Sequence, residues 1–419
     1  MVRRIGFACF SSEGHLNPSI TLATQLADRG HEIVFFSLAD GREKIQRAGF
    51  RVRIYGEDQF SLADIRDGYA QLGRLSGMAA VRLTLDAVGR RAEVGLRDFP
   101  DQFADENIAG LLVDQILPDA AAVARAEQIP FVSICNALPM NLSADVPPVF
   151  SHGWPGRGLF PQLRNRALNG VANHLSKPIL KRLNTFQRGR GLTPYEHAEQ
   201  VGSDLAQITQ IPKSFDFPVR PVPSCFHYSG PFHNLADRPA IAFPWDRIDR
   251  SRPLVYASMG TLQNRLGWVY RSIAEASKNL PIQLVISTGG GGQADQLNHL
   301  PGDPIVVDYA PQLQLLDHAT LCITHAGLNT TLESLARGVP MLAIPITNDQ
   351  PGVAARIQHT GCGITLRLRH AHARNLTAAL RDLLSNPQYR SNAHRLRYDI
   401  QSTDGPKRAA DIIEKSLQL

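Results

Sequence analysis

The chain has 419 residues, more than a single ordinary hydrophobic core accommodates, and we therefore expect two domains. Hydrophobic residues make up 43% of the chain and charged residues 20%, a composition that excludes a disordered protein. The formal net charge of +6 is small for this length and does not indicate a nucleic-acid partner.

The first residues and the cysteines bear on the compartment in which the protein works. Residues 1–7 lack the long apolar stretch of a signal peptide, and no apolar run reaches the roughly 18–20 residues that span a bilayer. The five cysteines are scattered without CxxC spacing, which indicates reduced thiols and no zinc site. We expect a cytoplasmic protein.

Strand-like and helix-like runs alternate along the first half of the chain. The runs typical of strands are residues 5–10, 32–37, 110–113 and 131–135, and those typical of helices are residues 18–29 and 119–128. Asn17 is a good helix cap and Pro18 suits a first helical turn, so the first helix is predicted to begin there. Such alternation predicts a doubly wound parallel sheet.

A long basic segment follows. Residues 146–195 contain no Asp or Glu, whereas eight Lys or Arg lie between Arg157 and Arg190. Apolar residues recur near helical spacing from Leu168 to Phe186, and Pro178 is predicted to divide this helix into two pieces. The pattern fits a basic amphipathic helix on an anionic membrane, and equally a helix that packs on its own domain with a solvated basic face.

After a Pro-, Asp- and Arg-rich stretch the alternation resumes. The new strand candidates are residues 254–257, 283–287, 304–307, 321–324 and 339–344. We therefore divide the chain into an N-terminal Rossmann-like domain, a linker, a C-terminal Rossmann-like domain and a last helix, at residues 1–232, 233–252, 253–400 and 401–419. Two such domains would face each other across a cleft, with ligands at the carboxyl ends of the strands.

The strand candidate 321–324 is followed by residues suited to binding an anion. Gly327 allows a tight turn, and Asn329 and Thr330 are good residues to open a helix, whose N-terminus attracts negative charge. Glu333, one turn further on, could hold ribose hydroxyls. The plainer interpretation is a capped helix after an ordinary turn.

The stretch from Tyr309 to Gln350 resembles the signature segment of the family 1 glycosyltransferases, which have the GT-B fold and use UDP-sugars. It holds Tyr309-Ala310-Pro311-Gln312, His325-Ala326-Gly327-Leu328-Asn329-Thr330, Glu333, Gly338-Val339-Pro340 and Asp349-Gln350 with every spacing kept. The resemblance implies that the last helix packs back on the N-terminal domain. Tyr309 and Leu328 stand where plant members usually have Trp, which leaves UDP and TDP open as donor nucleotides.

The same resemblance implies a role for each donor-side residue. Tyr309 would stack on the base beside Gln312, and Glu333 would hold the ribose. The diphosphate would be met by His325, Asn329 and Thr330 around Gly327, and from the opposing turn by Ser258, Gly260 and Thr261. Asp349 and Gln350 would contact the sugar hydroxyls.

The loop after the first strand candidate carries His15 where a dinucleotide-binding protein would have a G-x-G-x-x-G motif. A histidine at the carboxyl edge of a strand suits a general base, and Asp114, at the end of another strand, could orient it. Taken alone, His15 could simply bond a loop carbonyl and Asp114 could cap a turn. The Gly-His-x-Asn-Pro loop, however, is similar to the family's base position, and Asp114 to its partner.

Five further stretches resemble the bacterial zeaxanthin glucosyltransferases: residues 136–139, 205–208, 216–218, 260–263 and 349–354. This implies an inverting, metal-independent enzyme without a cofactor, which moves glucose from UDP-glucose to a hydroxyl of a hydrophobic molecule such as zeaxanthin. Peripheral contact of residues 157–190 with the inner face of the membrane would suit such an acceptor.

Three alternatives remain open at this point. A transferase for phenolics such as flavonoids would differ in the acceptor pocket, expected between Phe60 and Phe160. A nucleotide-sugar-binding protein without transfer activity would be expected to have lost His15 and Asp114. A nucleotide-sugar epimerase of the same fold fits the His15 loop less well.

Overall fold

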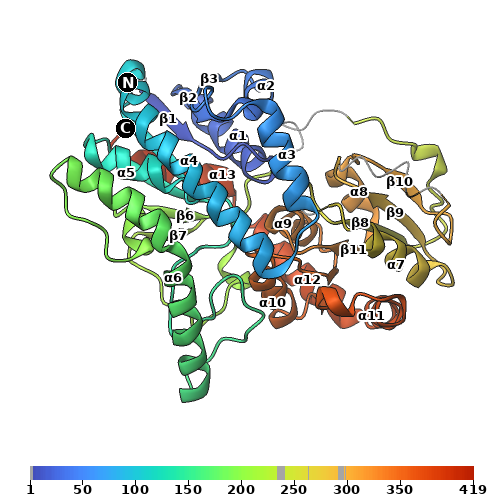
Figure 1. Ribbon diagram of the computed structural model, residues 1–419. Coiled ribbons are helices and arrows are strands. Elements are labelled where there is room, and N and C mark those ends of the chain that lie inside the picture. The colour runs from blue at the N-terminus through green and yellow to red at the C-terminus, as the bar shows by residue number, and fades with distance from the viewer. Residues whose placement is uncertain (1–2, 234–240, 263, 291–296, 298) are drawn as a thin grey trace.

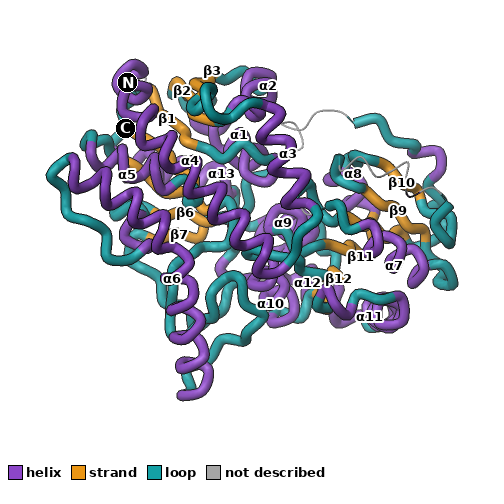
Figure 2. The backbone as a smooth tube through the Cα atoms, viewed as in Figure 1, coloured by secondary structure: helices purple, strands orange, loops and turns teal. Residues whose placement is uncertain are grey.

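The computed structural model describes residues 3–233, 241–262, 264–290, 297 and 299–419. Two parallel sheets, each flanked by helices on both faces, form the two halves of the molecule (Figures 1 and 2). This is the predicted pair of doubly wound Rossmann-like units. The predicted linker at residues 233–252 falls partly on residues 234–240, which lie outside the described residues.

The first half is built on a seven-stranded sheet of order β3-β2-β1-β4-β5-β6-β7. Its strands are β1 (Arg4–Ala8), β2 (Glu32–Ser37), β3 (Arg51–Ile54), β4 (Gly110–Asp114), β5 (Phe131–Cys135), β6 (Gln207–Thr209) and β7 (Phe226–Tyr228). All of their pairings are parallel. Both faces of β4 and β5 are buried, which explains why these strands are almost continuously apolar in sequence.

Two hydrophobic clusters hold the helices on this first sheet. The helices of the first half are α1 (Glu13–Ala27), α2 (Arg42–Arg47), α3 (Leu62–Gly73), α4 (Gly77–Glu106), α5 (Pro118–Ala126) and α6 (Leu159–Gly189). One cluster joins α1 to one face of the sheet, and the other joins α4, α5 and α6 to the opposite face. The carboxyl edge of the sheet stays open between these layers, and polar residues gather there.

The second half has a six-stranded sheet of order β10-β9-β8-β11-β12-β13. Its strands are β8 (Leu254–Ser258), β9 (Gln283–Ser287), β10 (Ile305–Val307), β11 (Ala319–Thr324), β12 (Met341–Ala343) and β13 (Gly363–Thr365). Its helices are α7 (Gly267–Ser277), α8 (Gln312–His318), α9 (Leu328–Ala336), α10 (Gln350–His359), α11 (Ala373–Ser385) and α12 (Pro387–Gln401). Side chains of α7 and α11 pack on one face, and those of α8, α9, α10 and α12 on the other.

The last helix, α13 (Gly405–Leu417), returns to the first half, as predicted. Ala409, Ile413 and Leu417 are buried against α1 and the first sheet. At its polar edge, Glu414 accepts hydrogen bonds from Arg29 at 2.6 Å and from His31 at 3.0 Å. The chain therefore crosses between the halves twice.

A buried ion pair joins the two halves. Arg356 on α10 places its Nη2 atom 2.7 Å from Oδ1 of Asp216, and both side chains are 1% exposed. Tyr228 donates a hydrogen bond of 2.8 Å to the other carboxylate oxygen. Burial raises the pKa of Asp216, but the guanidinium groups of Arg356 and Arg220 outweigh it and hold the pKa below its ordinary value.

Two helix predictions are wrong, both because a proline lies inside a helix. The first helix begins at Glu13 and not at Pro18, and Ser12 is its N-cap. The basic helix α6 runs through Pro178 without a break. Ile179 and Leu183 pack against the α4–α5 layer directly after Pro178, and this tertiary packing carries the helix past the missing N–H group.

In the part of the chain that the structure describes, no helix is both long enough and apolar enough to cross a bilayer.

Candidate active site

A cavity of about 1640 Å³ lies between the two halves. Pockets for drug-sized ligands are usually smaller, roughly 300–1,000 Å³, so this one has room for two substrates. Every residue predicted for catalysis or donor binding lines it: His15, Asp114, Ser258, Gly260, Thr261, Tyr309, Gln312, His325, Gly327, Asn329, Thr330, Glu333, Asp349 and Gln350. The fold thus brings together residues more than 300 positions apart in the chain.

His15 and Asp114 meet at the carboxyl edge of the first sheet. The first turn of α1 carries His15, whose Nδ1 atom lies 2.6 Å from Oδ2 of Asp114 at the end of β4. The His15 side chain is 14% exposed and that of Asp114 is fully buried. Since Asp114 accepts the proton of Nδ1, the nitrogen that remains to take a proton is Nε2.

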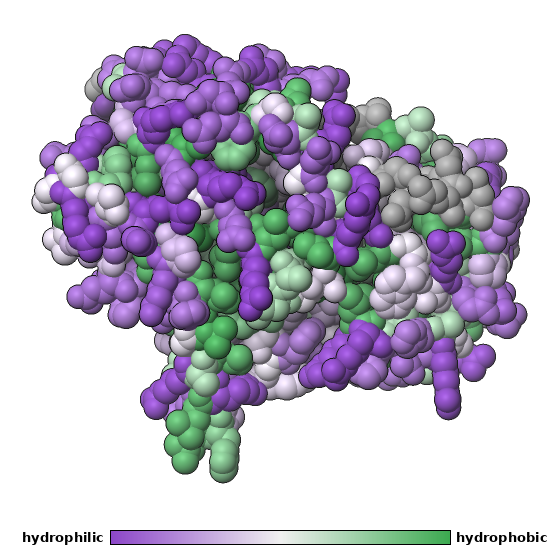
Figure 3. Space-filling view, viewed as in Figure 1, coloured by the Kyte–Doolittle hydropathy of each residue, from purple (hydrophilic) through white to green (hydrophobic). Residues whose placement is uncertain are grey.

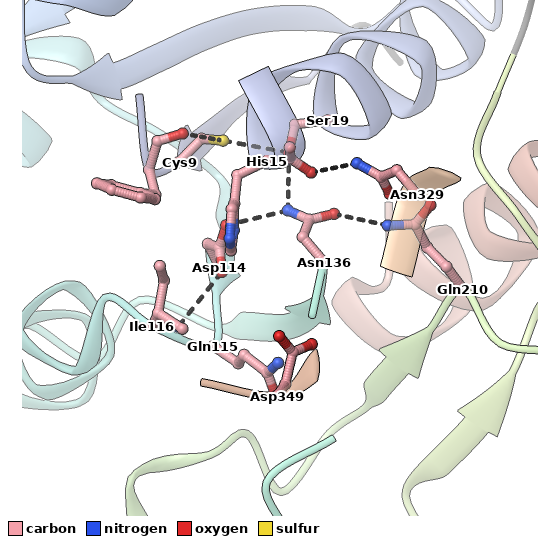
Figure 4. A network of polar contacts seen from close by, with 12 residues as sticks. Cys9, His15, Ser19, Asp114, Gln115, Ile116, Asn136, Gln210, Asn329 and Asp349 are labelled. Atoms are coloured by element: carbon pink, nitrogen blue, oxygen red, sulfur yellow. Dashed lines mark hydrogen bonds and ion pairs between the residues drawn. The ribbon is translucent and has the colours of Figure 1, made fainter. Parts of the chain in front are cut away.

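A network of hydrogen bonds fixes the carboxylate of Asp114 (Figure 4). Asn136 donates to its Oδ2 at 3.0 Å, and the amide of Ile116 donates to its Oδ1 at 3.3 Å. Asn136 also donates to Ser19 and accepts from Gln210, which ties β5 and β6 to α1. A carboxylate held this firmly can orient the imidazole without turning away from it.

No role was predicted for Asn136 and Gln210, which the structure places behind Asp114. Asn136 directly follows β5, so the rule that singled out Asp114 at the end of a strand could also have found Asn136. Gln210 likewise follows β6.

Aromatic packing fixes the His15 ring from another side. The ring of Phe10 meets the imidazole edge-on with centroids 5.2 Å apart, and the guanidinium of Arg91 lies 4.2 Å from the centroid of Phe10. Arg91 comes from α4 and is almost completely buried. The stack thus links the position of His15 to a helix of the opposite layer.

The loop of His15 directly contacts the side of the cavity that is predicted to bind the donor. Because Pro18 has no N–H group, the carbonyl of Gly14 lacks the hydrogen bond that the residue four positions later normally gives. Asn329 of α9 donates to this carbonyl instead, at 2.5 Å. The proline inside α1 therefore creates a contact between the two walls of the cavity.

The side of the cavity that is predicted to bind the donor is built around the N-terminus of α9. Gly327 is the N-cap with an ordinary φ of −63°, and the tight turn predicted for Gly327 is made by Ala326, with φ +63°. Gly327 is needed for space, because a Cβ atom there would lie 2.5 Å from the ring of His325. A Cβ atom on Gly260 would meet the same ring at 2.5 Å.

His325 is thus held between the two glycine turns that follow β8 and β11. Burial lowers the pKa of His325 to about 4, so its ring is neutral near pH 7. A neutral imidazole can still donate one hydrogen bond to a phosphate oxygen. The free N–H groups of α9 add donors and a positive dipole end next to it.

Gln312, which is expected beside the base, is hydrogen-bonded to three residues of the second half. It donates to Thr330 at 3.3 Å and to the carboxylate of Glu333, and its oxygen accepts from Tyr256 at 3.1 Å. Tyr309 is 54% exposed at the wall of the cavity, where its ring face can meet a flat base.

The side chains of Asp349 and Gln350 already accept hydrogen bonds from main-chain amides. Oδ2 of Asp349 accepts the amide of Leu138 at 3.0 Å, and burial raises the pKa of this carboxyl. Hydroxyl donors of a sugar would stabilise such a carboxylate. Oε1 of Gln350 accepts the amides of Ile346 and Thr347, so it also fixes its own loop.

Beyond His15 most of the lining residues are apolar. Helices α3, α4 and α6 line it with Ile65, Leu72, Val81, Leu85, Val88, Leu175, Ile179 and Leu180. Phe60 belongs to this wall, as expected, but Phe160 does not. Phe160 lies at the N-terminal end of α6 and is 83% exposed.

Comparison with known proteins agrees with this arrangement. The family model described as UDP-glucoronosyl and UDP-glucosyl transferase matches residues 91–407. The zeaxanthin glucosyltransferase of Pantoea ananas is 30% identical over 404 residues, 96% of this chain and 93% of that protein. The enzyme of the same name from Pseudescherichia vulneris is 30% identical over 403 residues, 94% of each chain.

Solved structures share the fold. A calicheamicin glycosyltransferase superposes with a TM-score of 0.74 at 24% identity, over 100% of this chain and 99% of that one. The glycosyltransferase VinC, solved in complex with dTDP, has a TM-score of 0.72 at 18% identity over 99% of both chains. The chain therefore belongs to the UDP-glucoronosyl and UDP-glucosyl transferase family, and it is a glycosyltransferase of GT-B fold.

Proposed function

We propose that this enzyme transfers glucose from UDP-glucose, with inversion and without a metal ion, to a hydroxyl of a hydrophobic acceptor, a hydroxycarotenoid such as zeaxanthin. The observation that carries the proposal is the His15–Asp114 pair, 2.6 Å apart, on one wall of a cavity whose other wall holds the N-terminus of α9. A base and an anion site face each other there.

The reaction follows from this opposition. The acceptor oxygen attacks C1 of the sugar and gives its proton to Nε2 of His15, while Asp114 stabilises the imidazolium that forms. The bond between C1 and the diphosphate oxygen breaks on the opposite side, so the anomeric configuration inverts. Donors fixed in advance at the N-terminus of α9 and at His325 stabilise the charge on the leaving diphosphate.

The donor is held along the second half of the cavity. Tyr309 stacks on the base beside Gln312, and Glu333 binds the ribose. The diphosphate is met by His325, Gly327, Asn329 and Thr330 on one side and by Ser258, Gly260 and Thr261 on the other. Asp349 and Gln350 bind the sugar hydroxyls, which satisfies the buried carboxylate of Asp349.

An apolar acceptor is favoured by the walls of α3, α4 and α6, which offer mostly hydrocarbon beyond His15. A long acceptor also suits the size of the cavity. Because such an acceptor is dissolved in lipid, we propose that the enzyme works in the cytoplasm with peripheral contact to the inner face of the membrane.

The proposal is tested by incubating the protein with UDP-glucose and EDTA, with either zeaxanthin in detergent or a flavonol as acceptor. Products are identified by mass spectrometry. A carotenoid glucoside is the expected result. A flavonol glucoside alone would overturn the acceptor but keep the mechanism, and a product that forms only when a divalent metal replaces EDTA would overturn metal independence. UDP binding without any product would point to a non-catalytic protein.

A further inference from the structure

The N-terminal end of α6 projects from the body of the first half (Figure 1). It carries three apolar side chains within five residues: Leu159 is 67% exposed, Phe160 83% and Leu163 50%. Single exposed apolar residues are common on soluble proteins, but a group at the tip of a projecting helix is not. We call these three residues the tip.

Basic side chains continue along the same outward face of α6. Arg166, Lys177, Lys181 and Arg188 are all exposed, and their spacings of 11, 4 and 7 residues place them on one side of a helix, in line with Leu159 and Leu163. In the described part of the chain, none of these four is found in an ion pair. Arg182 and Arg190, by contrast, pair with Glu93 and Glu127 of the body.

The opposite face of the same helix belongs to the active-site cavity. Leu175, Ile179 and Leu183 line it from α6. In Figure 3 hydrophobic residues extend from the hollow between the two halves down to the projecting end of α6. The same helix therefore carries the tip at its N-terminal end and part of the apolar wall of the cavity further along.

We infer that α6 is a membrane-docking helix: the tip enters the interface of an anionic bilayer while Arg166, Lys177, Lys181 and Arg188 lie on its headgroups. An anionic bilayer attracts a protein surface on which apolar side chains are flanked by basic ones. The inference rests on the proposed lipid-dissolved acceptor, because docking through α6 would hold the enzyme at the surface in which such an acceptor is dissolved.

The inference is tested by sedimentation of the full-length protein with vesicles of phosphatidylcholine, alone or with about a quarter phosphatidylglycerol. We expect binding to the anionic vesicles only. A tip variant, Leu159→Ser/Phe160→Ser/Leu163→Ser, and a charge variant, Lys177→Gln/Lys181→Gln/Arg188→Gln, should each bind roughly tenfold more weakly. Tyr398→Ser, which removes an aromatic side chain that is 75% exposed on α12, is the matched control and should bind like the wild type.

Transfer to a water-soluble flavonol separates docking from chemistry. The tip residues do not line the cavity, so the tip variant should keep whatever flavonol activity the wild type has and lose transfer to zeaxanthin embedded in vesicles. Wild-type protein that ignores anionic vesicles, or a tip variant that binds them normally, would overturn the inference. So would a dimer in light scattering that disappears with the tip variant. Vesicle binding needs no turnover, so it can succeed even where the proposed function fails.

Discussion

At the scale of single residues, the absence of an N–H group at Pro18 leads to a hydrogen bond between the two walls of the cavity. Pro18 deprives the Gly14 carbonyl of its partner within α1, and Asn329 from the other half of the molecule supplies a donor at 2.5 Å. His15 lies next to Gly14, so the residue proposed to meet the diphosphate also holds the loop that carries the base. Donor binding and base position are thereby physically connected.

This connection predicts a coupling between residues 18 and 329. Asn329→Ala should lower the free energy of unfolding by about 1 kcal/mol, because a carbonyl in the cleft loses its partner. In the Pro18→Ala background the helix itself supplies an N–H group to the carbonyl of Gly14. Asn329→Ala should then lower the free energy of unfolding by clearly less. Urea denaturation of the four proteins measures the difference; equal costs in both backgrounds would argue against the contact.

At the scale of elements, the contact between α4 and α5 depends on the absence of a side chain. A Cβ atom on Gly95 would lie 1.8 Å from Oδ2 of Asp119 and 2.7 Å from the ring of Phe99. Asp119 is fully buried, and burial raises its pKa to about 7. The same layer carries Arg91 toward Phe10 and His15, so the close approach of the two helices also positions the candidate active site.

Gly95→Ala should therefore destabilise the protein by about 1–3 kcal/mol, since the buried side chains of Asp119 and Phe99 must move to admit a methyl group. The matched control is Gly170→Ala on α6, where no atom lies within 4 Å of the added Cβ. Replacing this exposed helical glycine with alanine should raise the free energy of unfolding by roughly 0.5–1 kcal/mol. Thermal unfolding of both variants decides: a shift of the same sign in each would contradict this packing.

At the scale of the whole molecule, the two halves are joined by the buried contact of Arg356 with Asp216 and by the return of α13 to α1. The cavity lies between these halves, so their relative position determines the distance from His15 to the residues that are predicted to bind the donor. A buried pair with additional hydrogen bonds fixes an orientation better than an exposed pair would.

Asp216→Asn should lower the free energy of unfolding by about 3–5 kcal/mol at pH 7, because it leaves the buried charge of Arg356 unpaired. The folded pKa of Asp216 is lowered, so its contribution is fully present above the unfolded value of about 4 and disappears as pH falls through the folded value. The difference between variant and wild type should therefore shrink in acid. Asp411→Asn, at an exposed pair with Arg29, should cost at most about 1 kcal/mol.

Much of this arrangement could be predicted from the sequence. The strands emerge as apolar runs because both faces of parallel sheets are buried, and most of the predicted donor residues lie in one stretch from Tyr309 to Gln350. Both errors in helix boundaries involve a proline, Pro18 or Pro178, that tertiary contacts retain inside a helix. Of the two supports of Asp114, Asn136 follows a predicted strand and could have been found by the same rule, whereas Gln210 follows β6, a strand that was not predicted. Phe160 was misplaced because sequence spacing does not show that α6 extends past the cavity.

The most direct test of the central claim is the turnover of His15→Ala, measured beside its affinity for UDP by calorimetry. We predict that turnover falls by roughly 10²–10⁴-fold while UDP affinity is unchanged, because the base meets only the acceptor. His370→Ala, at an exposed histidine away from the cavity, should leave both quantities intact. Near-normal turnover of His15→Ala would contradict the proposed mechanism.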